Sequence, residues 1–184
     1  LRNDPKGDIY VVDLNERNES KRVQRLTGSD FFDNAPAWSP DGKHIAYASR
    51  KSGEINDNVW LINLETGEKG IDAARAKLSF VDALQRNINT IQKTQLTTEG
   101  GSTPSFSADG QYIAFTTGSN GVWGNISVLR LSDNRIVSLT EGKEMDGFPT
   151  WSLDGKMIYF TRFSDDTNLD GSVTIDDMSN IWSM

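Results

Sequence analysis

The sequence predicts an all-β chain, a partial β-propeller of about three four-stranded blades, and two observations lead to this fold class. The first is a motif that occurs three times, at residues 36–47, 104–115 and 149–160, and places a proline, an aromatic residue, a serine and an Asp-Gly pair at fixed spacing. The second is the repeat length, because the last two copies start 45 residues apart, which is typical of one propeller blade. We expect residues 1–184 to form a single propeller segment.

Each copy of the motif predicts a short strand, a tight turn and a second strand. The turns fall at Asp41-Gly42, Asp109-Gly110 and Asp154-Gly155, where glycine supplies the positive φ that a hairpin turn needs. An aspartate in such a turn accepts hydrogen bonds from nearby backbone N–H groups. We therefore interpret the recurring aspartates as turn residues and not as catalytic carboxylates.

Third and fourth strands follow each hairpin. The third strand is predicted at residues 58–64 and 125–131, and also at both ends of the chain, at 8–14 and 180–184. The fourth strand ends in a Leu-Thr pair, at residues 26–27, 96–97 and 139–140. The chain is thus expected to open with two strands of one blade, continue with two whole blades and close with three strands of another.

One helical insertion is predicted at residues 70–93. The first two motif copies start 68 residues apart, 23 more than the later interval. Between Ile71 and Lys93 there is no glycine or proline, and the apolar residues recur every three or four positions, which is typical of an amphipathic helix. We expect this helix to lie on the surface of the propeller, with docking to a partner or a second copy as the alternative.

The aromatic residues and the one histidine are interpreted structurally. One aromatic set shares a place in the first strand and another shares a register in the third, so we expect both to pack between blades: Trp38, Phe106 and Trp151, and Tyr10, Trp60 and Trp182. His44 lies on a second strand, where the other copies have Tyr112 and Met157. No G-x-S-x-G motif accompanies it, so no catalytic or cofactor-binding residue is predicted and the segment is not expected to be an enzyme.

The repeated motif resembles the TolB-like propeller repeat, which also occurs in the propellers of prolyl-oligopeptidase-type peptidases. The resemblance covers nearly the whole chain outside the helical insertion. It implies a periplasmic or extracellular protein and a propeller with more blades than this chain supplies. We expect the remaining blades to come from the same polypeptide, from another protein chain, or from a second copy of this one.

A calcium loop is predicted at residues 166–177, where the sequence fits D-x-N-x-D-G followed by an acid at position twelve. The expected ligands are side chains or carbonyl oxygens of five residues: Asp166, Asn168, Asp170, Ser172 and Asp177. The pattern resembles an EF-hand loop, and more closely a dockerin loop. Strand patterns on both sides place it between two strands, so we expect Ca²⁺ to be structural. Because the side chain of Asp177 is short, Asp165 or Asp176 is an alternative ligand.

Composition narrows the function. The net charge of −7 argues against nucleic acid, whose phosphates require a basic surface. No cysteine is present, which excludes disulfides and thiolate chemistry, and no apolar run is long enough to span a membrane. We expect a non-catalytic, calcium-binding scaffold for protein interaction. The alternatives are the propeller domain of a prolyl-oligopeptidase-type serine peptidase and a carbohydrate-binding propeller.

Overall fold

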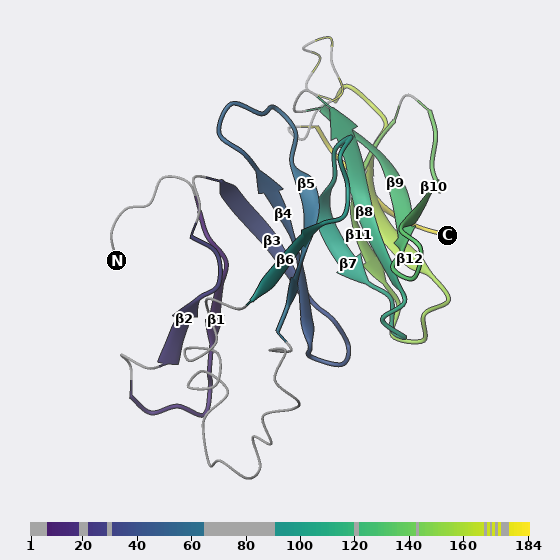
Figure 1. Ribbon diagram of the computed structural model, residues 1–184. Helices are drawn as coiled ribbons and strands as arrows, with labels where there is room; N and C mark the ends of the chain where they lie inside the picture. Colours follow the sequence, from purple (N-terminus) through teal and green to yellow (C-terminus); the bar gives the residue numbers. More distant parts are fainter. Residues whose placement is uncertain are drawn as a thin grey trace.

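The computed structural model describes residues 7–18, 22–28, 31–64, 91–119, 122–142, 144–167, 169, 171, 173 and 177–184. Within these ranges the chain forms thirteen β-strands in four antiparallel sheets, which confirms the all-β class (Figure 1). No helix in the described ranges is long and apolar enough to cross a membrane.

Every sheet is a meander of strands that follow one another in the chain. The first sheet contains β1 (Tyr10–Val12) and β2 (Val23–Arg25). The second contains β3 (Phe32–Trp38), β4 (His44–Arg50), β5 (Asn58–Asn63) and β6 (Gln92–Gln95). The third contains β7 (Ser102–Phe106), β8 (Tyr112–Ser119), β9 (Val122–Arg130) and β10 (Arg135–Ser138). The fourth contains β11 (Met145–Trp151), β12 (Ile158–Phe163) and β13 (Asn180–Ser183).

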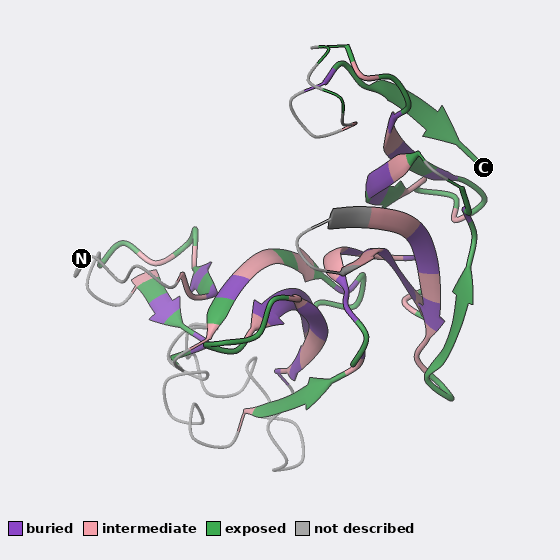
Figure 2. Cartoon of the chain, turned by 90° about the horizontal axis from the view of Figure 1, so that it is seen from above, coloured by how far each residue is buried: buried purple, intermediate pink, exposed green. Residues whose placement is uncertain are grey.

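The sheets follow one another along a curve, as a view from above shows (Figure 2). The strands that open the second, third and fourth sheets lie side by side, because β3 contacts β7 and β7 contacts β11. We call β3, β7 and β11 the inner strands. This arrangement of four-stranded meanders around their first strands is that of propeller blades.

The hydrophobic core lies between the sheets and is divided into three clusters. The first cluster joins the first and second sheets and contains Ile9, Val11, Leu26, Ile45, Tyr47, Ile62 and Leu64. The second cluster joins the second and third sheets and contains Ala46, Val59, Ile113, Phe115 and Leu129. The third cluster joins the third and fourth sheets and contains Ala114, Ile126, Ile158 and Phe160. Neighbouring residues such as Ile45 and Ala46 belong to different clusters because successive strand residues point to opposite faces. Strands β4 and β8 are therefore covered on both faces.

A bulge interrupts each inner strand at the residue before its proline. Ala35, Thr103 and Phe148 have φ angles of 48°, 47° and 55°, and the register of each strand shifts at this point. Proline lacks the N–H that a regular ladder would use, so a bulge is a place where it is tolerated. The same bulge in three strands gives them one common bend.

The hairpin turns form as predicted and stack from sheet to sheet. Gly42, Gly110 and Gly155 each have a φ of 70°. Gly110 lies against the preceding turn, since a Cβ there would be 3.6 Å from the Cδ of Pro40. Gly155 is placed in the same way, since a Cβ there would be 3.7 Å from the Cβ of Ala108.

Two predictions about position need correction. Residues 65–90, which hold most of the expected helix, lie outside the described ranges, but Gln92 and Lys93 are part of β6 and pair with Asn63 and Ile62. The predicted helix at 70–93 is therefore wrong at its end, because hydrogen bonds to β5 hold these residues in a strand. The fourth strands also end two residues earlier than expected, just before each Leu-Thr pair.

The aromatic residues pack between sheets only in part. Phe106 and Trp151 pack against the second and third clusters, and Trp60 packs against the first, as predicted. Trp38 is 48% exposed, and Tyr10 and Trp182 are exposed to a similar degree. The prediction is wrong for these three, because no described sheet covers the faces on which they lie.

Candidate functional site

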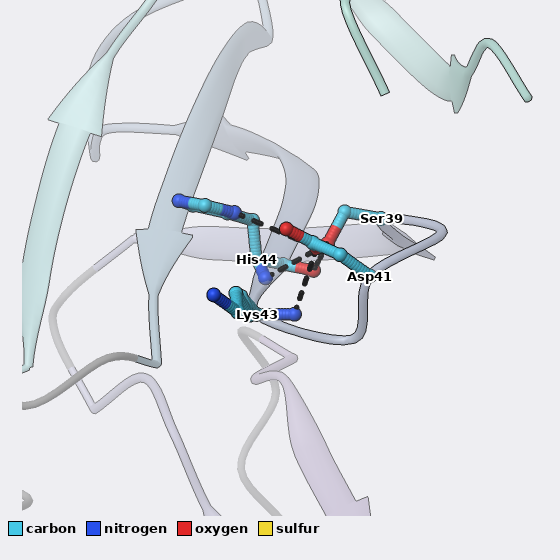
Figure 3. A network of polar contacts seen from close by, with 4 residues as sticks. All are labelled: Ser39, Asp41, Lys43 and His44. Atoms are coloured by element: carbon cyan, nitrogen blue, oxygen red, sulfur yellow. Dashed lines mark hydrogen bonds and ion pairs between the residues drawn. The ribbon is translucent and has the colours of Figure 1, made fainter. Parts of the chain in front are cut away.

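The polar residues of the repeated motif serve the hairpin turns. Ser39 Oγ donates a hydrogen bond to Asp41 Oδ1 at 2.6 Å, and this carboxylate oxygen also accepts the Lys43 N–H at 3.0 Å (Figure 3). The Ser107–Asp109 and Ser152–Asp154 pairs repeat the first contact at 2.6 Å. The hydrogen bond from the serine is the main cause that lowers the pKa of all three aspartates below the ordinary value, and the hydrogen bond from the backbone N–H is the next. This confirms the interpretation of these aspartates as turn residues.

Ser39, Asp41 and His44 together have the composition of a hydrolase triad but not its geometry. In a triad the imidazole takes the serine proton. Here Ser39 Oγ donates to the carboxylate and accepts the backbone N–H of His44 at 2.9 Å, while the imidazole Nδ1 lies 3.9 Å from Asp41 Oδ1 (Figure 3). The other two copies keep the Ser–Asp pair beside Tyr112 and Met157, so the cluster is explained by the turn.

The threonine of each Leu-Thr pair fastens the fourth strand to the third. The Oγ1 atoms of Thr27, Thr97 and Thr140 accept the N–H groups of Ile9, Val59 and Ile126, each at 2.9 Å. Thr27 and Thr97 also donate to Asp8 and Asn58, each at 3.2 Å. Sequence reasoning found the Leu-Thr recurrence but missed this role, which the matching Asp or Asn before each third strand could have indicated.

The predicted calcium loop connects β12 to β13. Gly171, with a φ of 91°, donates its N–H to Asp166 Oδ2 at 2.8 Å. Asp177 is buried, and its Oδ1 accepts the N–H and the hydroxyl of Thr167 at 2.7 and 3.0 Å. The first and last acids of the motif are thus held by the backbone of the loop itself.

The other expected ligands, Asn168, Asp170 and Ser172, lie outside the described residues. In the described ranges no group of three or more histidine, cysteine or acidic side chains is arranged to hold a metal. The observed contacts nevertheless fit a calcium loop in two respects: the glycine at position six makes the required reversal, and two carboxylates supply hard oxygen donors.

An apolar groove lies where the three inner strands meet. We call it the inner groove; its volume is about 430 Å³, and it is lined by the bulges of β3, β7 and β11. The lining residues include Pro36, Pro104 and Pro149 together with Trp38 and Phe148. Trp38 and Phe148 are each nearly half exposed, so the groove presents aromatic surface to solvent.

Comparison with known proteins points to one kind of propeller. No family model matches the sequence. The Tol-Pal system protein TolB of Francisella tularensis subsp. mediasiatica (strain FSC147) is 26% identical over an alignment of 203 positions that covers 93% of this chain and 43% of the relative. The protein of the same name from strain SCHU S4 of subsp. tularensis is also 26% identical, over 42% of its length. The chain therefore spans less than half the length of the curated relatives it matches.

Solved structures show the same fold. A putative TolB from Agrobacterium tumefaciens aligns with a TM-score of 0.60 at 19% identity, over 88% of this chain and 48% of that one. TolB from Acinetobacter baumannii aligns with a TM-score of 0.58 at 20% identity, over 95% of this chain and 37% of that one. Prolyl oligopeptidase B from Galerina marginata aligns with a TM-score of 0.55 at 12% identity, over 90% of this chain and 23% of that one. The fold is therefore that of a β-propeller, and the curated proteins to which the chain is similar are TolB proteins.

Proposed function

We propose that this chain is a calcium-binding, TolB-like propeller segment that acts as a non-catalytic scaffold for protein interaction in the periplasm or outside the cell. The observation that carries the proposal is the inner groove. The polar residues of the repeats are engaged in turns and strand ends, whereas the groove offers Trp38 and Phe148 at the meeting point of three sheets. Exposed aromatic residues in a concave site are typical anchors for a partner protein.

The prolines support an interaction role for this groove. They fix the backbone of the bulges, so the aromatic side chains are presented on a rigid surface and little conformational entropy is lost on binding. The curated relatives are named for the Tol-Pal system, and a component of such a system is therefore the class of partner we propose.

The test is binding of the full chain to the purified Pal component of the Tol-Pal system of the same organism, measured by biolayer interferometry. We expect Trp38→Ala and Phe148→Ala to weaken the interaction by about tenfold or more, as for aromatic anchors. Leu153→Ala is the control, because Leu153 is an exposed apolar residue outside the inner groove. Absence of binding, or equal binding by the groove variants, would overturn the proposed role.

Calcium enters the proposal through the β12–β13 loop. The carboxylates of Asp166 and of the buried Asp177 stand at the two ends of a short loop that contains further acids. A bound cation would offset the repulsion between these negative charges. The proposed ligands are Asp166, Asn168, Asp170, the carbonyl of Ser172, and Asp177. Bound Ca²⁺ would hold β13 against β12, which is a structural role.

Calorimetric titration with CaCl₂ and, separately, MgCl₂ tests the site. We expect saturable calcium binding and a rise in the melting temperature that EDTA reverses. Asp166→Asn should abolish that rise, because the amide oxygen still accepts the Gly171 N–H while the charge is lost. Asp133→Asn, a distant exposed acid, should leave it unchanged. A wild-type melting temperature that is independent of calcium would count against the site.

A second candidate is the propeller domain of a serine peptidase. The fold of Galerina prolyl oligopeptidase B favours it, although 12% identity supports the fold alone. A G-x-S-x-G hydrolase segment elsewhere in the same gene would decide for this alternative. The carbohydrate-binding alternative likewise rests on the fold alone, since the oligogalacturonate lyase of Vibrio parahaemolyticus aligns at 19% identity.

A further inference from the structure

A second groove lies between the second and third sheets, beside their Asp-Gly turns. We call it the inter-sheet groove; its volume is about 670 Å³, within the range of small-molecule sites. Its apolar lining includes Leu61, Leu96, Phe106 and Leu131, which also pack against the second core cluster. Because the core supports these side chains from behind, the apolar surface of the groove is preformed.

The polar lining of the inter-sheet groove includes two acids beside Ser39, Thr94 and Asn134. Asp41 and Asp109, from the equivalent turns of the two sheets, both line it, together with His44. The lining contains no lysine or arginine. The groove therefore combines an apolar surface with two negative charges.

The two carboxylates keep binding capacity after serving their turns. Ser39, the Lys43 N–H and, at 3.9 Å, His44 all contact Oδ1 of Asp41. The contacts of Asp109 from Ser107 and the Gln111 N–H also end on Oδ1. Within the described part of the chain, Oδ2 of each aspartate thus accepts no hydrogen bond. The pKa of both carboxyls is lowered by the serine hydrogen bond, so both are ionised at neutral pH.

We propose that the inter-sheet groove binds an organic cation, an ammonium or guanidinium group on an apolar stem. The stem packs against Leu61, Leu96 and Leu131, and the cationic head pairs with Asp41 and Asp109. A bare metal ion fits less well, because the described residues hold no group of three metal-ligating side chains. An anionic ligand would be repelled. The site lies apart from the calcium loop, and its lining shares Phe106 with the inner groove.

The test is an ¹H–¹⁵N NMR titration of the full chain with 4-phenylbutylamine. We expect saturable shifts of the backbone amides of Lys43, His44 and Gln111. The neutral analogue 4-phenylbutanol should bind at least tenfold more weakly, and 4-phenylbutyrate should not bind. Equal affinity for the amine and the alcohol, or no saturation with the amine, would overturn the proposal.

Matched variants separate binding from turn stability. Asp41→Asn and Asp109→Asn should each weaken amine binding by about tenfold, as expected for loss of one charge-assisted contact. Asp154→Asn is the control, because Asp154 makes the same turn contact but does not line the inter-sheet groove. Thr94→Lys places an ammonium group on an exposed lining position and should also block the amine. If Asp154→Asn is as harmful as Asp41→Asn, or if Thr94→Lys leaves binding intact, the proposal fails.

The cation could belong to a free amine or to a lysine side chain of a protein. A parallel titration with acetyl-lysine methylamide distinguishes these sources. Binding of this probe at an affinity similar to that of 4-phenylbutylamine supports a docking site for a basic side chain. Binding of 4-phenylbutylamine alone supports a small-molecule site. Failure of both probes overturns the inference.

Discussion

The guanidinium of Arg162 donates two parallel hydrogen bonds to the carboxylate of Asp146, from Nε to Oδ1 and from Nη2 to Oδ2, each 2.7 Å long. Asp146 is only 1% exposed, and the two residues are direct partners in the β11–β12 ladder. The guanidinium also stands over the rings of Phe160 and Trp182, at 5.4 and 5.1 Å. One side chain thus connects all three strands of the fourth sheet.

Replacing Arg162 should therefore destabilise the protein. Arg162→Met keeps most of the aliphatic volume but leaves the buried Asp146 carboxylate without its partner, at a cost of about 3 kcal/mol. Urea unfolding monitored by tryptophan fluorescence measures the change. Arg130→Met is the control, because the Arg130–Asp133 pair is exposed and its loss should leave the midpoint nearly unchanged. Equal shifts for both variants would contradict the special role of Arg162.

The threonine that joins the strand ends predicts a second difference. Thr97→Val preserves shape but leaves the buried Val59 N–H without an acceptor, which should cost about 1–3 kcal/mol. The neighbouring Thr98 is exposed, so Thr98→Val should have little effect. Both variants can be compared by chemical denaturation. The interpretation would be wrong if Thr97→Val were as stable as the unsubstituted protein.

The bulges predict an unusual response to glycine. Ala35 has a φ of 48°, a conformation that costs a residue with a Cβ about 1 kcal/mol. Ala35→Gly should therefore be neutral or stabilising, whereas Ala37→Gly, in the same strand, should destabilise by about 0.5–1 kcal/mol. Thermal and urea unfolding of the two variants provide the comparison. A similar loss of stability in both would show that the bulge is not strained.

The turn aspartates predict sensitivity to acid. The pKa of Asp41, Asp109 and Asp154 in the folded state lies below the ordinary value of 3.8. Their stabilising contribution is therefore fully present above that value and is lost as the pH falls through the folded-state pKa. Unfolding curves between pH 7 and pH 3 should show this loss. The triple Asp→Asn variant should show a smaller decline, and an identical decline would contradict the assignment.

Local chemistry explains what the sequence could predict. The Asp-Gly turns, the strand order and the place of residues 166–177 between β12 and β13 follow from short motifs, since neighbouring residues alone determine them. The Arg162–Asp146 pair could not be predicted from a short motif, because it depends on the register between β11 and β12, which brings together two residues 16 positions apart in the sequence. The exposure of Trp38 and the strand state of Gln92 depend on which sheet faces which, a property of the assembled fold. The calcium ligands stay a prediction.

The meander order of every sheet has a consequence for how the protein folds. Each strand pairs with its neighbours in the chain, and each sheet packs on the next one along. Chains with this property behave as a row of coupled units, each stabilised by its own hairpins and by its two flanking interfaces. Hydrogen exchange should then report separate opening events, with the two-stranded sheet of β1 and β2 exchanging before the doubly covered strands β4 and β8.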